Sequence, residues 1–232
     1  MITHIEKCEK GSDNYPKALE NLKGMPACLY FKGDIAILND LKSVAIVGSR
    51  ECSEGALSFS YEVGALAAKK GVAVVNGLAL GCDTAAIKGA ISNGGKCVAI
   101  MPSGLNNIYP KSNSELADKI LECGGCIISE YEPDVEPKKY TYVQRDRLQS
   151  ALSQGVFVVE AGIESGTMHT VEAALKQNRV LAAYADALIK ASGNRYVIEK
   201  HGKEITNIDD FETFINNLPA LGENRQMTLW DL

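Results

Sequence analysis

The turn formed by Gly48, Ser49 and Arg50 has the residue types of an anion site. It follows an apolar run at residues 44–47, and a helical pattern begins a few residues later. A glycine lets the backbone approach a ligand closely, a serine offers a hydroxyl, and an arginine can hold phosphate oxygens in bidentate fashion. Free amides at the start of the expected helix would favour the same ligand. The turn therefore predicts a phosphate site, with an ordinary turn and a solvated Arg50 as the alternative.

Two further turns follow apolar runs in the same way. One leads from Gly77 to Asp83, and the other contains Ser165, Gly166 and Thr167 before a second helix. The carboxyl ends of parallel strands meet at one edge of a sheet, so we expect the three turns to lie close together. The dinucleotide fingerprint G-x-G-x-x-G is absent, which argues against a nicotinamide or flavin, and we expect no cofactor.

Residues 138–142, Lys-Lys-Tyr-Thr-Tyr, are the most basic and aromatic part of a stretch at 132–144 that we interpret as a loop. Bases stack on aromatic rings and phosphates pair with lysines, so this stretch suits a single strand of nucleic acid. The alternative is a surface loop with its tyrosines packed down. Arg145 and Arg147 then open a helix, where positive charge opposes the macrodipole. We expect them to face an anion or a carboxylate, and Asp146 could hold one of them.

Strand and helix patterns alternate along the chain and position these turns. Buried strands are expected at residues 43–47, 72–75, 96–101, 126–131, 155–160 and 180–184. Helical patterns are expected at residues 55–70, 83–93, 114–123, 145–153, 171–177 and 209–218. This order predicts an α/β fold, an extended Rossmann-like, doubly wound and mostly parallel sheet with helices on both faces. Residues 26–33 should add a strand at the sheet edge or pack over its flank.

Composition limits the classes of function. The 232 residues carry a formal net charge of −5, which argues against a generally basic nucleic-acid binder, so positive charge must be local. No apolar segment is long enough for a membrane span, and the polar N-terminus does not resemble a signal peptide. Seven scattered cysteines fit a reducing, cytoplasmic compartment. Cys123 and Cys126 have metal spacing without further ligands nearby, so no metal site is expected.

Several ordered motifs together resemble the DprA (Smf) family of DNA-processing proteins. They are VAIVGSR at 44–50, NGLALGCD at 76–83, GLNNIYP at 104–110 with Asn113, SEY at 129–131, RDR at 145–147, VVEA at 158–161 with SGT at 165–167, and SGN at 192–194. The similarity covers residues 15–214, the extended Rossmann domain of that family.

The resemblance implies a protein without catalytic activity that binds single-stranded DNA and delivers it to the RecA recombinase during DNA uptake. It also implies a homodimer. In that family the DNA enters a pocket at the strand ends. Ser49, Arg50 and residues 165–167 would then hold phosphate, and four further side chains would line the same pocket: Asp83, Lys111, Arg145 and Arg147.

The chain departs from the family pattern at three positions. Cys82 replaces an isoleucine, Ile87 replaces a histidine, and Asp146 replaces the central asparagine of the R-N-R motif.

The expected fold also resembles nucleoside-monophosphate phosphoribohydrolases, which carry P-G-G-x-G-T-x-x-E. Thr170 stands where their glutamate would be, and Glu172 comes two residues too late for the same helix face. A nucleotide sensor or hydrolase is therefore the alternative function.

We expect three segments: a lead-in at residues 1–42 that packs on the main domain, a Rossmann domain at 43–218, and a flexible tail at 219–232. No winged-helix domain is expected after the tail.

Gln226, Leu229 and Trp230 resemble the short peptide by which bacterial repair proteins dock onto the sliding clamp. Leucine and tryptophan would fill an apolar pocket and the glutamine would bond at its rim. The alternative is that Leu229 and Trp230 fold back onto the protein.

Overall fold

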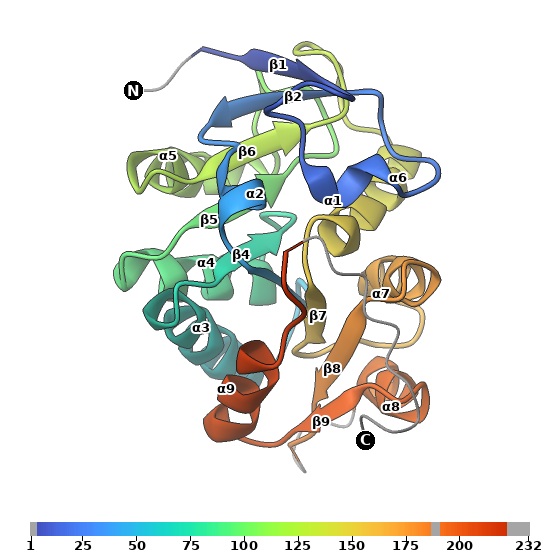
Figure 1. Ribbon diagram of the computed structural model, residues 1–232. Coiled ribbons are helices and arrows are strands. Elements are labelled where there is room, and N and C mark those ends of the chain that lie inside the picture. Colours follow the sequence, from blue (N-terminus) through green and yellow to red (C-terminus); the bar gives the residue numbers. More distant parts are fainter. Residues whose placement is uncertain (1–3, 187–190, 222–232) are drawn as a thin grey trace.

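A computed structural model describes residues 4–186 and 191–221 of the chain. The strands are β1 (Glu6–Glu9), β2 (Cys28–Gly33), β3 (Ser43–Val47), β4 (Ala73–Asn76), β5 (Cys97–Ile100), β6 (Cys126–Ser129), β7 (Gly155–Val158), β8 (Val180–Tyr184) and β9 (Lys203–Ile205). Within the described residues they form one sheet in the order β1-β2-β6-β5-β4-β3-β7-β8-β9 (Figure 1). Pairing is parallel from β6 to β9, while β1 and β2 join antiparallel.

Helices cover both faces of this sheet. The helical elements are α1 (Lys17–Glu20), α2 (Ile37–Asp40), α3 (Glu54–Lys69), α4 (Cys82–Ser92), the 3-10 helix η1 (Lys111–Asn113), α5 (Ser114–Glu122), α6 (Lys139–Ala151), α7 (Thr167–Lys176), α8 (Ser192–Glu199) and α9 (Ile208–Asn216). The core on one face includes side chains of α3, α4, α5 and α9. On the other face, α1, α2 and α6 share one core, and α7 and α8 share a second (Figure 1). The predicted doubly wound α/β fold is confirmed.

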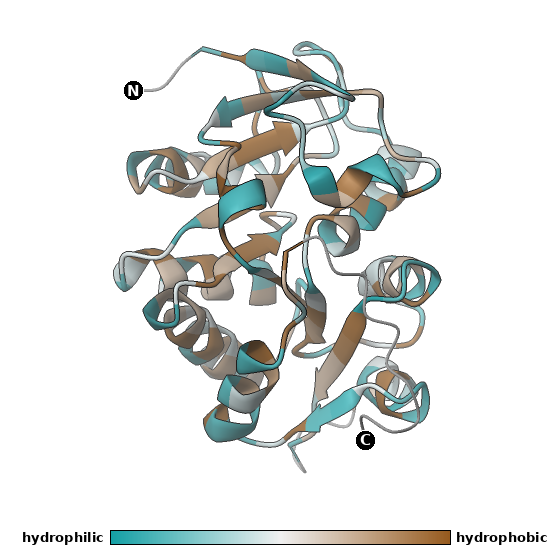
Figure 2. Cartoon of the chain, viewed as in Figure 1, coloured by the Kyte–Doolittle hydropathy of each residue, from teal (hydrophilic) through white to brown (hydrophobic). Residues whose placement is uncertain are grey.

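Strand β3 shows why a continuous apolar run forms the centre of such a sheet. Successive side chains point to opposite faces, so Val44 and Ile46 enter the core under α3 and α4. Ala45 and Val47 enter the core under α7 and α8. Every residue of the strand is buried, and hydrophobic colouring follows the central strands in Figure 2. Because both faces of the strand are buried, its sequence lacks the alternation of polar and apolar residues that a strand with one exposed face has.

The chain reverses its direction of travel across the sheet at β3. From β3 it runs through β4, β5 and β6 on one side, and it then returns to place β7, β8 and β9 on the other. The loops that leave β3 and β7 therefore diverge between neighbouring strands. In open α/β sheets, the crevice at such a switch point is where ligands bind.

Two expectations about local structure differ from the observed fold. Residues 139–144 belong to helix α6 rather than to a loop, so Arg145 lies inside the helix and not at its start. β2 is not the edge of the sheet, because it pairs with a further strand, β1, which the polar sequence of residues 6–9 did not reveal.

The predicted clamp-binding residues Gln226, Leu229 and Trp230 lie outside the described residues. No helix in the described part of the chain has the length and apolar character needed to cross a membrane.

Helices α3 and α4 pack through glycines at their contact. A Cβ on Gly64 would overlap the carbonyl of Ala86, and a Cβ on Gly89 would overlap the carbonyl of Tyr61. The two backbones therefore touch without intervening side chains. The close approach depends on the absence of a side chain at both positions.

We predict that Gly89→Ala lowers the free energy of unfolding by about 1–3 kcal/mol, because the added methyl group must separate two packed backbones. Gly55→Ala on the exposed side of α3 is the matched control, since its Cβ would meet nothing within 4 Å. That change should be neutral or stabilise by up to about 1 kcal/mol. Urea denaturation of both variants measures the difference, and equal midpoints would contradict the packing argument.

Candidate functional site

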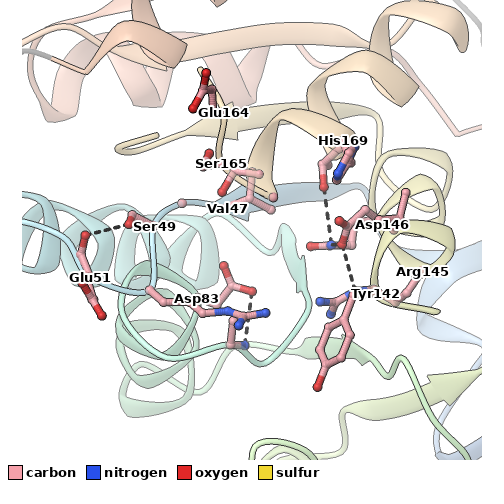
Figure 3. Close-up of a pocket in the computed structure, with 18 of the residues that line it drawn as sticks. Val47, Ser49, Glu51, Asp83, Tyr142, Arg145, Asp146, Glu164, Ser165 and His169 are labelled. Atoms are coloured by element: carbon pink, nitrogen blue, oxygen red, sulfur yellow. Dashed lines mark hydrogen bonds and ion pairs between the residues drawn. The ribbon is translucent and has the colours of Figure 1, made fainter. Parts of the chain in front are cut away.

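A cavity of about 720 Å³ opens at the carboxyl ends of the strands around the switch point. Its walls come from the turn after β3, the loop before α4, helix α6 and the turn into α7 (Figure 3). The lining residues are Val47, Gly48, Ser49, Arg50, Glu51, Ala79, Asp83, Lys139, Tyr142, Val143, Arg145, Asp146, Gln149, Glu164, Ser165, Gly166, Thr167, His169 and Thr170. The expectation that the three turns meet in space is therefore confirmed.

Backbone bonds fix the turn after β3. The Ser49 amide donates to the Glu160 carbonyl at 2.7 Å, and the Ser49 hydroxyl donates to the Glu51 carbonyl at 2.6 Å. A Cβ on Gly48 would lie 2.6 Å from Cys82 Sγ, so the position needs a glycine. The guanidinium of Arg50 is exposed and lies 5.5 Å from the ring centroid of Tyr142, within cation–π range.

The start of α3 already holds an anion, which is the protein's own Glu160. Its carboxylate accepts from the Ser53 amide at 3.2 Å and from the Ser53 hydroxyl at 2.6 Å. Ser53 in turn caps the helix by accepting from the Ala56 amide. The expectation of free amides at the start of this helix is therefore only partly met. The Ser53 and Ala56 amides have acceptors, whereas none is found for the amides of Glu54 and Gly55 among the described residues. The carboxylate of Glu160 already lies at this helix start, so Arg50 is the cationic group that the turn offers to a ligand.

The start of α7 offers free donors. Helix α7 has no side-chain cap, and its N-terminal turn lines the cavity. Among the residues that the structure describes, no acceptor is found for the amides of Gly166 and Thr167. The Ser165 hydroxyl is buried and likewise lacks a partner there. Two backbone amides and the positive end of the helix thus face the pocket together.

A buried arginine forms the floor of the pocket. Arg145 is 5% exposed, donates from Nη1 to the Ile100 carbonyl at 2.7 Å, and places Nε 3.0 Å from Asp146 Oδ1. Its guanidinium lies against the backbone of Gly77, where any Cβ would overlap it. Gly77 does not line the cavity; its role is to leave room for this guanidinium. An arginine cannot lose its charge, so its burial requires partners of opposite charge.

Two buried carboxylates flank Arg145. Asp83, labelled in Figure 3, is one of them, and it accepts from the amides of Gly77 at 2.9 Å and Ala79 at 3.4 Å. Burial raises the pKa of Asp83 to about 6, against the opposing effects of Arg145 and these two amides. Burial also raises the pKa of Asp146, and Arg145 again opposes the shift. One guanidinium therefore faces two carboxyl groups, so the floor has no excess of positive charge.

Free positive charge lies at the pocket mouth. Arg50 and Lys139 are both exposed, and no ion pair is found for either in the part of the chain that the structure describes. Glu51 and Glu164 also belong to the lining. The cavity thus combines exposed cations with carboxylates, which suits a ligand with both phosphate and hydrogen-bond donor groups. No cluster of three potential metal ligands occurs within residues 4–186 and 191–221.

Besides Gly77, two of the expected site residues lie outside this cavity. Arg147 forms a bidentate pair with Glu130, at 2.8 and 2.7 Å, and also donates to the Gly24 carbonyl. Lys111 is exposed on η1 and does not line the pocket. Glu172, the residue weighed for hydrolysis, accepts from the Tyr196 hydroxyl at 2.7 Å and is not part of the lining either.

Sequence reasoning missed Gln149 and Thr170, which line the floor. Gln149 lies one helical turn after Arg145, and Thr170 one turn after Thr167, so both follow from the helical repeat once the helix boundaries are known. The start of α6 was hidden because Lys138 stands at the N-cap position. The capping group is instead the Thr141 side chain, which accepts from the Lys138 amide at 2.9 Å.

The fold and the pocket define a doubly wound α/β protein whose ligand site lies at the switch point of its sheet. The family model of DNA recombination-mediator protein A matches residues 7–216. The chain belongs to that family, as the motifs indicated.

Curated relatives support the assignment. The chain is 36% identical to DNA processing protein DprA of Streptococcus pneumoniae over 201 residues, which cover 85% of this chain and 70% of the relative. It is 37% identical to protein Smf of Escherichia coli over 172 residues, 74% of this chain and 46% of that protein. The chain thus spans about half the length of the Escherichia coli relative.

A solved structure agrees closely with the fold. DNA processing protein A of Helicobacter pylori superposes with a TM-score of 0.81 at 32% identity, covering 94% of this chain and 98% of that one. That structure addresses the single-stranded DNA binding mode of the Helicobacter pylori protein.

We predict that Asp83 makes stability depend on pH. Its folded pKa of about 6 exceeds the ordinary 3.8, so the folded protein holds this proton more tightly than the unfolded chain. The resulting stabilisation is complete below about pH 4 and is lost as pH rises through about 6, with a total of up to about 3 kcal/mol. Asp83→Asn should remove this part of the dependence in denaturant titrations between pH 4 and 7.

The exposed Asp118→Asn variant on α5 is the control and should follow the wild-type profile. Asp146 shifts in the same direction as Asp83 and is present in both proteins, so the comparison isolates Asp83. Identical profiles for wild type and Asp83→Asn would show that this carboxyl is not perturbed.

Proposed function

We propose that this protein binds single-stranded DNA through the pocket at the switch point and performs no chemical step on it. The observation that carries the proposal is the grouping of Arg50, Lys139 and the free amides of Gly166 and Thr167 around one opening. Side-chain cations and helix-start amides are the two usual phosphate-binding groups of proteins. Because the protein has a formal net charge of −5, DNA binding depends on the local positive charge around this opening.

Aromatic and apolar side chains beside the cations suit unpaired bases. Tyr140 is 57% exposed and Val143 is 42% exposed, both on α6 near Lys139. Tyr142 lies under Arg50 at the pocket mouth. Bases of a single strand can stack on such groups, whereas the bases of a duplex are already stacked on one another. A preference for single strands over duplex follows.

Five finer proposals accompany this binding role. The DNA would be an intermediate of recombination or of DNA uptake, RecA would be the recombinase that receives it, and the protein would act as a homodimer. The cytoplasm is the proposed compartment, supported by seven cysteines that are all free thiols. Contact with the sliding clamp through Gln226, Leu229 and Trp230 also stays a proposal.

The hydrolytic alternative has little support in the pocket. Glu172 is bonded to Tyr196 on α8, away from the lining residues. Thr170 supplies a hydroxyl rather than a carboxylate at the position that the hydrolase motif requires. The proposed function therefore contains no catalytic residue.

We predict that Arg50→Ala weakens binding of a short single-stranded oligonucleotide by about 1.5–3 kcal/mol, the range for hydrogen bonds to charged groups. The loss should shrink as salt concentration rises, because counterion release contributes to such contacts. Fluorescence anisotropy across salt concentrations measures both effects. Arg195→Ala, at an exposed position on α8 outside the pocket, is the matched control. Unchanged affinity of Arg50→Ala at low salt would refute the role of this arginine.

For Arg147 the structure predicts a different outcome. Arg147→Ala should lower the free energy of unfolding by about 1–3 kcal/mol, since it leaves the half-buried Glu130 without its partner. Its slope of log affinity against log salt should match that of the wild type, because the side chain is already paired outside the pocket. A flatter slope would place Arg147 on the DNA path after all.

A further inference from the structure

Glu160, which follows β7, is bonded to both ends of the turn that carries Arg50. Its carbonyl accepts from the Ser49 amide at 2.7 Å. Its carboxylate accepts from the Ser53 amide at 3.2 Å and from the Ser53 hydroxyl at 2.6 Å. The first and the last residue of the turn at positions 49–53 are therefore both held by one residue of the neighbouring strand end.

The middle of this turn has few bonds of its own. The Ser49 hydroxyl donates to the Glu51 carbonyl at 2.6 Å (Figure 3). Among the described residues, no acceptor is found for the amides of Arg50 and Glu51. The guanidinium of Arg50 is exposed and lies over the ring of Tyr142, which belongs to α6. The place of Arg50 at the pocket mouth is thus set mainly by the two ends of the turn.

Glu160 lies behind the turn rather than in the pocket. It is half-buried and does not belong to the lining residues, so its carboxylate is not placed to contact a ligand there. By charge alone, a carboxylate next to a phosphate site weakens the binding of phosphate. Any benefit of Glu160 to phosphate binding must therefore come through its bonds to the turn.

We propose that Glu160 is a positioning residue for DNA binding, which keeps Arg50 directed at the pocket mouth by holding both ends of its turn. A cation that is already in place binds phosphate without the entropic cost of ordering its loop. The proposal rests on the proposed function, in which Arg50 contacts phosphate. It extends that function from the residues that touch the strand to one that holds them.

The first test is the affinity of Glu160→Ala for a short oligothymidine, measured by fluorescence anisotropy at low salt. We expect binding about tenfold weaker than in the wild type, from the lost preorganisation of one long side chain. The loss of a negative charge alone predicts the opposite sign. Glu164→Ala is the charge control, because it removes a carboxylate of the lining that has no bond to the turn in the described structure, and it should bind equally well or more tightly. Equal or tighter binding of Glu160→Ala would overturn the proposal.

A conservative variant and a double variant separate positioning from a general loss of structure. The amide of Glu160→Gln can accept from the Ser53 amide and donate to the Ser53 hydroxyl oxygen, so we expect affinity within about twofold of the wild type. The double variant Arg50→Ala with Glu160→Ala should bind within about twofold of Arg50→Ala, because no guanidinium is left to position. Losses that multiply in the double variant, or a Glu160→Gln protein as weak as Glu160→Ala, would contradict the proposed role.

Amide hydrogen exchange without DNA tests the turn directly. Exchange of the Ser53 amide should be faster in Glu160→Ala and stay slow in Glu160→Gln, while the amides of α5 are unchanged in both. If the wild type binds no strand, the proposed function fails, and this comparison still decides whether Glu160 holds the turn. Unchanged exchange of Ser53 in Glu160→Ala would show that it does not. If that variant does not fold, Glu160→Asp, whose carboxylate is one methylene shorter, should show the same changes in affinity and exchange.

Discussion

The buried guanidinium of Arg145 is the constraint on which the pocket depends. It contacts the end of β5 through the Ile100 carbonyl, the turn after β4 through the backbone of Gly77, and its own helix through Asp146. Removing a permanent charge from water is unfavourable unless carboxylates and carbonyls surround it. Asp83 and Asp146 are therefore needed in a pocket that we propose for an anionic ligand. The exposed positive charge of the pocket lies with Arg50 and Lys139 at its mouth.

The strands of the sheet could be predicted because the pattern that specifies each strand lies within a short stretch of sequence. Central strands buried on both faces must be continuous apolar runs, and small-residue turns must follow them. The start of α6 could not be predicted, because Lys138 and the tyrosines after it have weak helix signals and the cap comes from Thr141. Strand β1 was equally hidden: an antiparallel edge strand with three charged residues out of four resembles a polar terminus.

The residues of the candidate site could be predicted where a single turn contains the residue types that bind phosphate. They could not be predicted where a residue far away in the sequence bonds to the group in question. Gly48, Ser49, Arg50 and residues 165–167 meet at the pocket because strand ends meet. At the start of α3, the amide and the hydroxyl of Ser53 are bonded to Glu160, which lies more than a hundred positions away in sequence. Arg147 has the same type and nearly the same position as Arg145, yet its pair with Glu130 turns it toward the lead-in segment. Such pairings depend on tertiary structure and leave no pattern in a single sequence.

The glycine contact between α3 and α4 also fixes one wall of the pocket. These helices follow the turn after β3 and the turn after β4, and their backbones touch at Gly64 and Gly89. Because no side chains separate the two backbones, the position of one helix determines the position of the other. Two segments of the pocket lining that lie about thirty residues apart in sequence, Ser49 and Arg50 on one side and Ala79 and Asp83 on the other, are therefore held at a fixed spacing by a contact that lies outside the pocket.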